Sequence, residues 1–185
     1  MNKHYEIKIA GLTRHLPLCP ISNDLYIGAF ILFGDVELTV ACAKELLKKA
    51  PEFDVMITAE SKGIPLVYEM TKQAGLNKYL LARKSAKLYM RDVVSVEVKS
   101  ITTEKRQMLF IDKDDAEYMK GKRVLIVDDV ISTGESVRAV EKLVQESGGI
   151  VAGRMTILAE GDADKRDDII FLAHLPLFNK DGVAI

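Results

Sequence analysis

The sequence predicts an α/β protein with a doubly wound parallel sheet, because buried strands and amphipathic helices alternate along it. Short apolar runs that suit strands buried on both faces occur at 53–58, 79–82, 124–127 and 150–158. Segments with apolar residues at helical spacing flank these runs at 36–49, 64–74 and 137–144. Turn and cap residues separate the two kinds of segment, and such alternation is typical of parallel sheets covered by helices.

The first fifty residues are expected to form one short strand, a loop and a helix. Residues 5–12 alternate enough for a strand, whereas two prolines and a Ser-Asn-Asp run predict a loop over 13–24. Asp35 is placed to cap a helix over 36–49.

A hairpin interrupts the alternation in the second half of the chain. Residues 93–101 and 106–111 alternate in polarity, so they predict two antiparallel strands that project from the sheet as a long hairpin. A polar turn with one short helix is expected over 112–122. Residues 169–172 predict a last strand, and the charged connection at 160–168 is expected to be a solvated loop without a chemical role.

Length and composition limit the classes of function. The chain has 185 residues, enough for one sizeable core, and we expect a single domain over residues 1–185. Its formal net charge is −1, so neither a nucleic acid nor a membrane is expected as a partner. No signal-peptide pattern or membrane-spanning run occurs, so a cytoplasmic protein is expected. Cys42 is expected in the core and Cys19 in the loop, and a disulfide between them is left open.

The most informative stretch is 123–136. A buried strand over 124–127 ends in two carboxylates, Asp128 and Asp129, and we expect both side chains to be exposed at the strand end. A loop with several hydroxyl groups and a helix N-terminus follow, and their N–H groups suit a phosphate. The loop residues of this predicted phosphate site are Ser132, Thr133, Gly134, Glu135 and Ser136. The carboxylates suit a ribose diol or a hydrated Mg²⁺, so the spacing predicts a site for a ribose 5-phosphate.

This stretch resembles the phosphoribosyl-diphosphate motif of the type I phosphoribosyltransferases. The motif has two acidic residues, two free positions, a small residue, Thr, Gly, any residue, and Ser or Thr, and Asp128 to Ser136 matches every position. A strand that ends in a solvated acidic pair before a capped helix is the alternative. The resemblance implies the fold of that family with a small N-terminal hood, and it suggests a homodimer.

Two other predicted strands also end in polar clusters, and ligands of open parallel sheets bind at such strand ends. One cluster contains Glu60, Ser61, Lys62 and Gly63. The other contains Arg83, Lys84 and Lys87. Their amides and cations suit a diphosphate leaving group, although a basic cluster alone is more often a solvated turn. Both resemble motifs of the adenine phosphoribosyltransferase family, Glu-Ser-Arg-Gly and Arg-Lys-x-x-Lys-Leu, with Lys62 in place of Arg.

The resemblance also implies residues that contact the base. The segment 28–35 is similar to the family's Pro-Gly-Ile-x-Phe-Arg-Asp segment, so Phe33 would lie against a purine with Gly34 beside it. Core packing is the alternative for Phe33, and Gly34 replaces the family's Arg. Glu104 is the candidate for the glutamate that the family places near the base, although this hairpin looks closer to that of the xanthine phosphoribosyltransferases.

Together, these resemblances imply an adenine-type purine phosphoribosyltransferase that uses phosphoribosyl diphosphate and a purine base. Asp128 and Asp129 would hold Mg²⁺ and act in catalysis with Glu104, and the hairpin over 90–107 would be a mobile cover that excludes water. An enzyme for xanthine or guanine is one alternative. A regulator that binds phosphoribosyl diphosphate without catalysis is the other.

Overall fold

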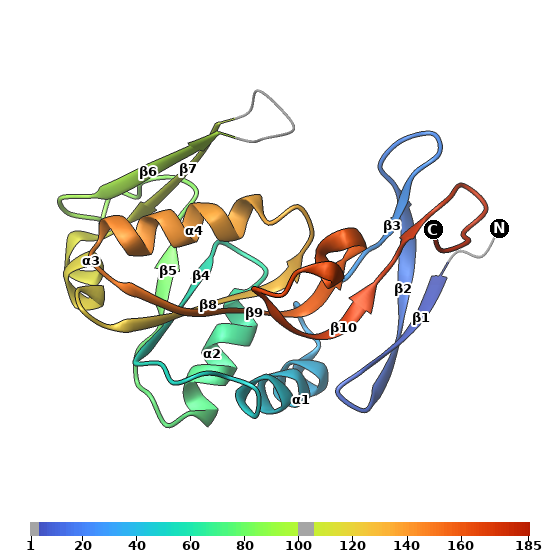
Figure 1. The fold of residues 1–185 in the computed structure, drawn as a ribbon, viewed down its shortest axis with the longest axis horizontal. Coiled ribbons are helices and arrows are strands. Elements are labelled where there is room, and N and C mark those ends of the chain that lie inside the picture. The colour runs from blue at the N-terminus through green and yellow to red at the C-terminus, as the bar shows by residue number, and fades with distance from the viewer. Residues whose placement is uncertain (1–3, 100–105) are drawn as a thin grey trace.

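The computed structural model describes residues 4–99 and 106–185, and its centre is a five-stranded sheet (Figure 1). The strand order is β10-β9-β8-β4-β5, and every neighbouring pair is parallel. The bounds are β4 Val55–Ala59, β5 Leu80–Ala82, β8 Arg123–Ile131, β9 Ile150–Glu160 and β10 Ile170–Leu175. The predicted parallel α/β sheet is therefore confirmed.

Helices cover both faces of this sheet, as a doubly wound fold requires. α1 (Val36–Leu47) and α2 (Ile64–Gln73) pack on one face, and α4 (Glu135–Glu146) packs on the other (Figure 1). β8 lies in the middle of the sheet, and its neighbouring residues Leu125 and Ile126 belong to the two opposite cores. Because both faces of β8 are buried, its sequence is a continuous apolar run rather than an alternation.

A second, four-stranded antiparallel sheet, which we call the hood sheet, lies at one end of the molecule (Figure 1). In spatial order its strands are β1 His4–Ile9, β2 Leu12–Pro20, β3 Tyr26–Gly28 and β11 Leu177–Phe178. The hood that the family resemblance implied is thus present, but the C-terminal part of the chain supplies one of its strands. Arg14 of β2 ties this sheet to the core: its Nε donates to Asp35 Oδ2 at 2.6 Å and its Nη2 to Glu37 Oε2 at 2.8 Å.

The loop predicted over 13–24 is wrong, because most of this segment forms β2. Ala10 and Gly11 have φ values of 51° and 81°, which fits the two-residue turns that connect antiparallel strands. Pro17 has no N–H, but its carbonyl accepts the N–H of Ala29 at 2.8 Å, so the proline still takes part in the sheet. Both prolines therefore lie within β2 and do not interrupt the strand.

The predicted hairpin is confirmed, and its strands are packed against the core. Val96 and Leu109 are buried in the core beneath α4. Phe110 exchanges two backbone hydrogen bonds of 2.8 Å with Arg83 at the end of β5. The elements of this region are β6 Val94–Lys99, β7 Arg106–Ile111 and α3 Lys113–Met119. The covering role of the hairpin stays a prediction.

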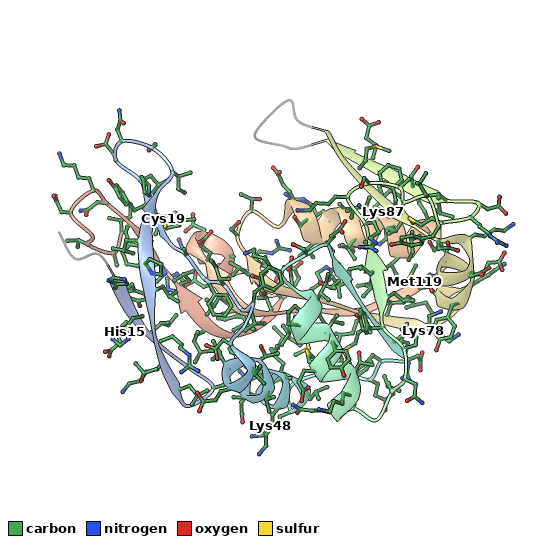
Figure 2. All side chains as sticks on the ribbon, turned by 180° about the vertical axis from the view of Figure 1, so that it is seen from behind. His15, Cys19, Lys48, Lys78, Lys87 and Met119 are labelled. Atoms are coloured by element: carbon green, nitrogen blue, oxygen red, sulfur yellow. The ribbon has the colours of Figure 1, made fainter. Side chains whose placement is uncertain are left out.

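The charged connection after β9, which was expected to be a solvated loop, contains a short 3-10 helix over Gly161–Lys165. Cys42 is buried in the core as expected, whereas Cys19 lies on β2 of the hood sheet, at a different level of the strand from His15 (Figure 2). Both thiols are free. Among the described ranges, the structure contains no helix of the length and apolar character needed to cross a bilayer.

Candidate active site

Three polar clusters lie together at the edge of the parallel sheet where β4, β5 and β8 end. Lys62 Nζ lies 2.9 Å from Asp129 Oδ2, which joins the cluster after β4 to β8. Arg83 Nη1 donates to Glu60 Oε1 at 2.9 Å, which joins the clusters after β4 and β5. The structure therefore brings together the three clusters that the sequence predicted, at the edge where open parallel sheets bind ligands.

The loop after β8 encloses a small cavity of about 130 Å³. Asp128 and residues 130–137 line it. Gly134 precedes the first turn of α4 with φ 75°, a left-handed conformation that favours glycine. The N–H groups of that turn have no partner within the helix, so they are available to an anion in the cavity.

The expectation that both carboxylates are exposed is wrong for Asp129, which is 2% exposed. The reason is that β8 continues to Ile131, so the pair lies within the strand and not beyond its end. Asp129 is paired with Lys62. Burial, and then the adjacent carboxylate of Asp129, raise the pKa of Asp128 well above the usual range of a carboxyl group.

Gly63 allows the turn after β4 to approach the acidic pair closely. A Cβ atom at this position would lie 2.2 Å from Thr58 Oγ1 and 3.3 Å from Asp128 Oδ1. The φ of Gly63 is −72°, so the need for glycine here is one of space and not of backbone conformation. The peptide bond between Glu60 and Ser61 in the same turn is cis.

Glu60 organises the basic cluster that follows β5. Its carboxylate accepts the Lys84 backbone N–H at 3.1 Å and also binds the Arg83 guanidinium. Both contacts, the Lys84 N–H foremost, hold the pKa of Glu60 below its usual range. Lys84 is exposed, and Lys87 Nζ donates to Ser85 Oγ at 3.0 Å. Figure 2 shows Lys87 far from the hood sheet. The two ammonium groups thus remain accessible to an anionic ligand.

The predicted base-contacting residues do not line the cavity at the phosphate loop. Phe33 is 50% exposed, which excludes core packing. Gly34 lines a separate cavity of about 210 Å³ with Tyr68 and Glu69. Contact of the base with Phe33 and Gly34 therefore stays a prediction. Glu104 lies outside the described residues.

A larger cavity of about 510 Å³ borders the phosphate loop and shares Ser132 and Thr133 with the small cavity. This volume lies within the roughly 300–1,000 Å³ that is typical of small-molecule sites. Its remaining lining residues are Ile21, Leu25, Glu160, Gly161, Asp162, Ala163, Arg166 and Leu177. The hood side of the molecule and the segment after β9 therefore both contribute to this cavity.

Two residues at the site, Glu160 and Arg166, lie in the segment that was expected to have no chemical role. Arg166 donates to both carboxylate oxygens of Asp168 at 2.8 and 2.7 Å, and its Nη1 packs against Gly134 of the phosphate loop. Glu160 is the last residue of β9, and burial raises its pKa. The strand-end rule, applied to β9, would have found Glu160, whereas no local pattern indicated Arg166.

The donors at the site suit a Mg²⁺ ion that is shared with a ligand. Within residues 4–99 and 106–185, no three acidic, His or Cys side chains form a metal-binding group. Mg²⁺ often takes one or two carboxylates together with waters and substrate phosphates. Asp128 and Asp129 fit that pattern.

Comparisons with known proteins identify the family. The phosphoribosyl transferase domain family matches residues 39–175. An adenine phosphoribosyltransferase of Acetivibrio thermocellus is 31% identical over 147 residues, which cover 76% of this chain and 80% of that protein. A hypoxanthine/guanine phosphoribosyltransferase of Methanocella paludicola is 28% identical over 147 residues, which cover 79% of this chain and 70% of that protein.

Solved structures agree with this result. The crystal structure of adenine phosphoribosyltransferase from Thermoanaerobacter pseudethanolicus matches with a TM-score of 0.62 at 28% identity, over 75% of this chain and 80% of that chain. The family match includes all five strands of the parallel sheet and the three polar clusters at its edge. The chain therefore belongs to the phosphoribosyltransferase family and has the type I fold.

Proposed function

We propose that this enzyme transfers the 5-phosphoribosyl group of phosphoribosyl diphosphate to adenine and releases diphosphate, as an enzyme of purine salvage. The observation that carries this function is the phosphate-sized cavity at the N-terminus of α4, which includes Asp128 in its wall. Similarity to adenine phosphoribosyltransferases supports the choice of base.

The polar groups at the sheet edge contact three parts of phosphoribosyl diphosphate: the 5-phosphate, the ribose and the diphosphate. The amides and hydroxyls of 132–136 hold the 5-phosphate, and Asp128 and Asp129 accept hydrogen bonds from the ribose hydroxyls. These contacts fix C1 of the ribose in line with the incoming base nitrogen. The negative charge of Asp129 also favours the positive charge that develops at C1 as its bond to diphosphate breaks.

The leaving diphosphate lies against the clusters after β4 and β5. The turn formed by Glu60, Ser61, Lys62 and Gly63 offers backbone amides and one ammonium group. Arg83, Lys84 and Lys87 add three further cations, which neutralise negative charge as it develops on the leaving group. Glu60 acts as a positioning residue here, because it holds the Arg83 guanidinium and the Lys84 backbone.

We propose Mg²⁺ as the cofactor, and Asp128 and Asp129 are the residues that would hold it. When bound, the ion supplies additional positive charge to the leaving group. Treatment with a chelator should abolish nucleotide formation, and added Mg²⁺ should restore it. Full activity in excess chelator would contradict the proposal.

A homodimer is proposed because exposed apolar side chains gather beside the 210 Å³ cavity. Val36 and Tyr68, which are 72% and 56% exposed, line it together with Val40. Contiguous apolar surface of this kind is typical of interaction sites. Light scattering should give twice the mass of the chain, and Tyr68→Ser should shift the protein toward the monomer. We also propose that residues 1–185 act as one domain in the cytoplasm.

The decisive experiment offers adenine, guanine, hypoxanthine, xanthine and orotate with phosphoribosyl diphosphate and Mg²⁺. Adenine should give the highest kcat/KM for nucleotide formation. Preference for guanine or hypoxanthine would favour the 6-oxopurine alternative, which the Methanocella relative supports. Binding of phosphoribosyl diphosphate without product from any base would favour a regulator.

A second experiment tests the predicted base contact of Phe33. If the purine stacks on this ring, Phe33→Ala should raise the KM for the base by roughly ten- to a hundredfold, since such stacking is worth roughly 1–3 kcal/mol. The KM for phosphoribosyl diphosphate should not change. An unchanged base KM would assign the base to another part of the site.

A further inference from the structure

We propose that Glu160 selects an amino-substituted purine, by accepting a hydrogen bond from the exocyclic amino group of a base bound in the 510 Å³ cavity. This inference rests on the proposed transferase function and deepens it. It names a specificity-determining residue that the motifs of the sequence did not indicate.

The 510 Å³ cavity lies beside the phosphate loop. It shares Ser132 and Thr133 with the phosphate loop, so a ligand whose 5-phosphate occupies that loop borders it directly. A base joined to C1 of the same ribose must lie within one sugar's length of the phosphate. The 210 Å³ cavity beside Gly34 shares no lining residue with the phosphate loop.

Apolar side chains form part of the wall of this cavity. Ile21, Leu25 and Leu177 approach from the hood side, and Ala163 lies in the short helix after β9. These side chains offer apolar surface on which a flat heterocycle can pack. The polar lining residues are Ser132, Thr133, Glu160, Asp162 and Arg166, and polar groups of this kind fix the orientation of a ligand in small-molecule sites.

The carboxyl group of Glu160 can accept further hydrogen bonds. Among the residues that the structure describes, no donor forms a hydrogen bond with it. It is partly buried at the end of β9, and Lys62 and Asp129 are its charged neighbours. Burial raises its pKa, whereas Lys62 opposes that shift. A half-buried acceptor without a donor is stabilised by a ligand that supplies one.

The hydrogen-bonding groups of adenine and of Glu160 are complementary. The 6-amino group of adenine donates hydrogen bonds, and the carboxyl group of Glu160 can accept one whether it is ionised or protonated. The protonated carboxyl can also donate to the adjacent ring nitrogen of adenine. A 6-oxo group presents a second acceptor to Glu160 and would meet repulsion from the ionised form.

The test compares adenine with 6-methylpurine, in which a methyl group of similar size replaces the amino group. For each protein, the ratio of the two kcat/KM values is measured at saturating phosphoribosyl diphosphate. The ratio cancels any loss of folded protein or of phosphoribosyl diphosphate binding. Wild type should prefer adenine by roughly ten- to a hundredfold, the discrimination typical of paired hydrogen bonds to a base.

Three variants test the assignment. Glu160→Leu should lower the ratio to near one, whereas Glu160→Gln should keep it, since its amide oxygen still accepts and its NH₂ group still donates. Asp164→Leu is the matched control, because Asp164 lies in the same segment but faces His174 at 3.8 Å. It should keep the wild-type ratio.

A failure of the proposed transferase function and a failure of the role of Glu160 give different results. If wild type forms no adenine nucleotide, the proposed function fails. If wild type forms it but uses 6-methylpurine equally well, or if Glu160→Leu keeps the full preference, only the role of Glu160 is overturned. Loss of the preference in Phe33→Ala but not in Glu160→Leu would place the amino group near Phe33. If Glu160→Leu does not fold, equal use of adenine and 6-methylpurine by wild type would still overturn the role of Glu160.

Discussion

Because Gly63 has no Cβ atom, the turn after β4 can lie close to Asp128 in the candidate active site. In Gly63→Ala the new methyl group would meet Thr58 Oγ1 at 2.2 Å, so the turn must move away from Asp128. We expect kcat/KM to fall at least about tenfold, because small misplacements of substrate-holding groups cost large factors in rate. Steady-state assays with adenine would measure this.

The double variant Gly63→Ala/Thr58→Ala is the matched control. It removes the hydroxyl that the new methyl group would meet, so much of the activity should return. If the single and double variants are equally impaired, the close contact with Thr58 is not the reason for glycine.

Asp128 should make the stability of the protein depend on pH. Its raised pKa means that the folded protein keeps a proton which the unfolded chain releases near pH 4. The free energy of unfolding should therefore decrease as the pH rises from about 4 toward the folded pKa, because the folded state binds more protons than the unfolded chain. Urea midpoints measured without ligands should fall over this range in wild type.

Asp128→Asn should remove most of that decrease and make the protein relatively more stable at alkaline pH. Asp24→Asn, which removes one carboxylate from an exposed turn, should leave the pH dependence as in wild type. Parallel curves for wild type and Asp128→Asn would show that Asp128 does not hold the proton.

At the residue scale, the sequence predicted the local order of strand, acidic pair, loop and helix in the candidate site and missed contacts that come from distant segments. Asp128 to Ser136 is one continuous motif, so the relation of acidic pair to phosphate loop follows from spacing. The burial of Asp129 depends on how far β8 continues and on Lys62, which lies 67 positions earlier. Arg166 reaches Gly134 only because the short 3-10 helix over Gly161–Lys165 turns the chain back toward α4, and no pattern in the sequence indicates that.

At the scale of elements, α1 begins where its cap residue predicts. Asp35 Oδ1 accepts the Leu38 N–H at 3.0 Å, and the same carboxylate binds Arg14 of the hood sheet. Arg14, foremost among its contacts, holds the pKa of Asp35 below its usual range. One side chain thus starts a helix and fixes the position of a second sheet.

Replacing Asp35 should therefore lower the free energy of unfolding by more than the loss of an ordinary N-cap does. Asp35→Ala should lower the free energy of unfolding by about 1–3 kcal/mol, the sum of a lost N-cap and a partly exposed ion pair. Arg14→Met keeps the cap and should cost about 1 kcal/mol or less. Urea denaturation of both variants measures the difference, and equal losses would show that the cap contributes nothing.

The elements that were missed are those whose partners lie far away in the sequence. The helices α1, α2 and α4 and the buried strands were predicted because caps and apolar spacing are local. β3 and β11 have three and two residues, and they are strands only because they pair with each other and with β2. Such short segments have too few side chains to show a period.

At the scale of the whole molecule, the buried side chain of Phe178 packs between strands of the hood sheet. This side chain is 1% exposed, and its ring lies 4.9 Å from that of Tyr5. Phe178→Ala should lower the free energy of unfolding by about 3–5 kcal/mol, as is typical when a buried aromatic ring is removed. Phe33→Ala, at an exposed ring, is the control and should change stability by about 0.5 kcal/mol or less. Similar losses in both would contradict this role of Phe178.

The pairing of Leu177 with Ile27 has a consequence for how the chain is made on the ribosome. These partners are 150 positions apart, so at about 5–20 residues per second the first hairpin emerges roughly ten to thirty seconds before its last neighbour exists. Throughout that interval the nascent chain presents the free edge of β3 to chaperones and to other nascent chains. A truncated chain that ends after β10 but before β11 would contain every strand of the parallel sheet but would leave β3 without its last neighbour.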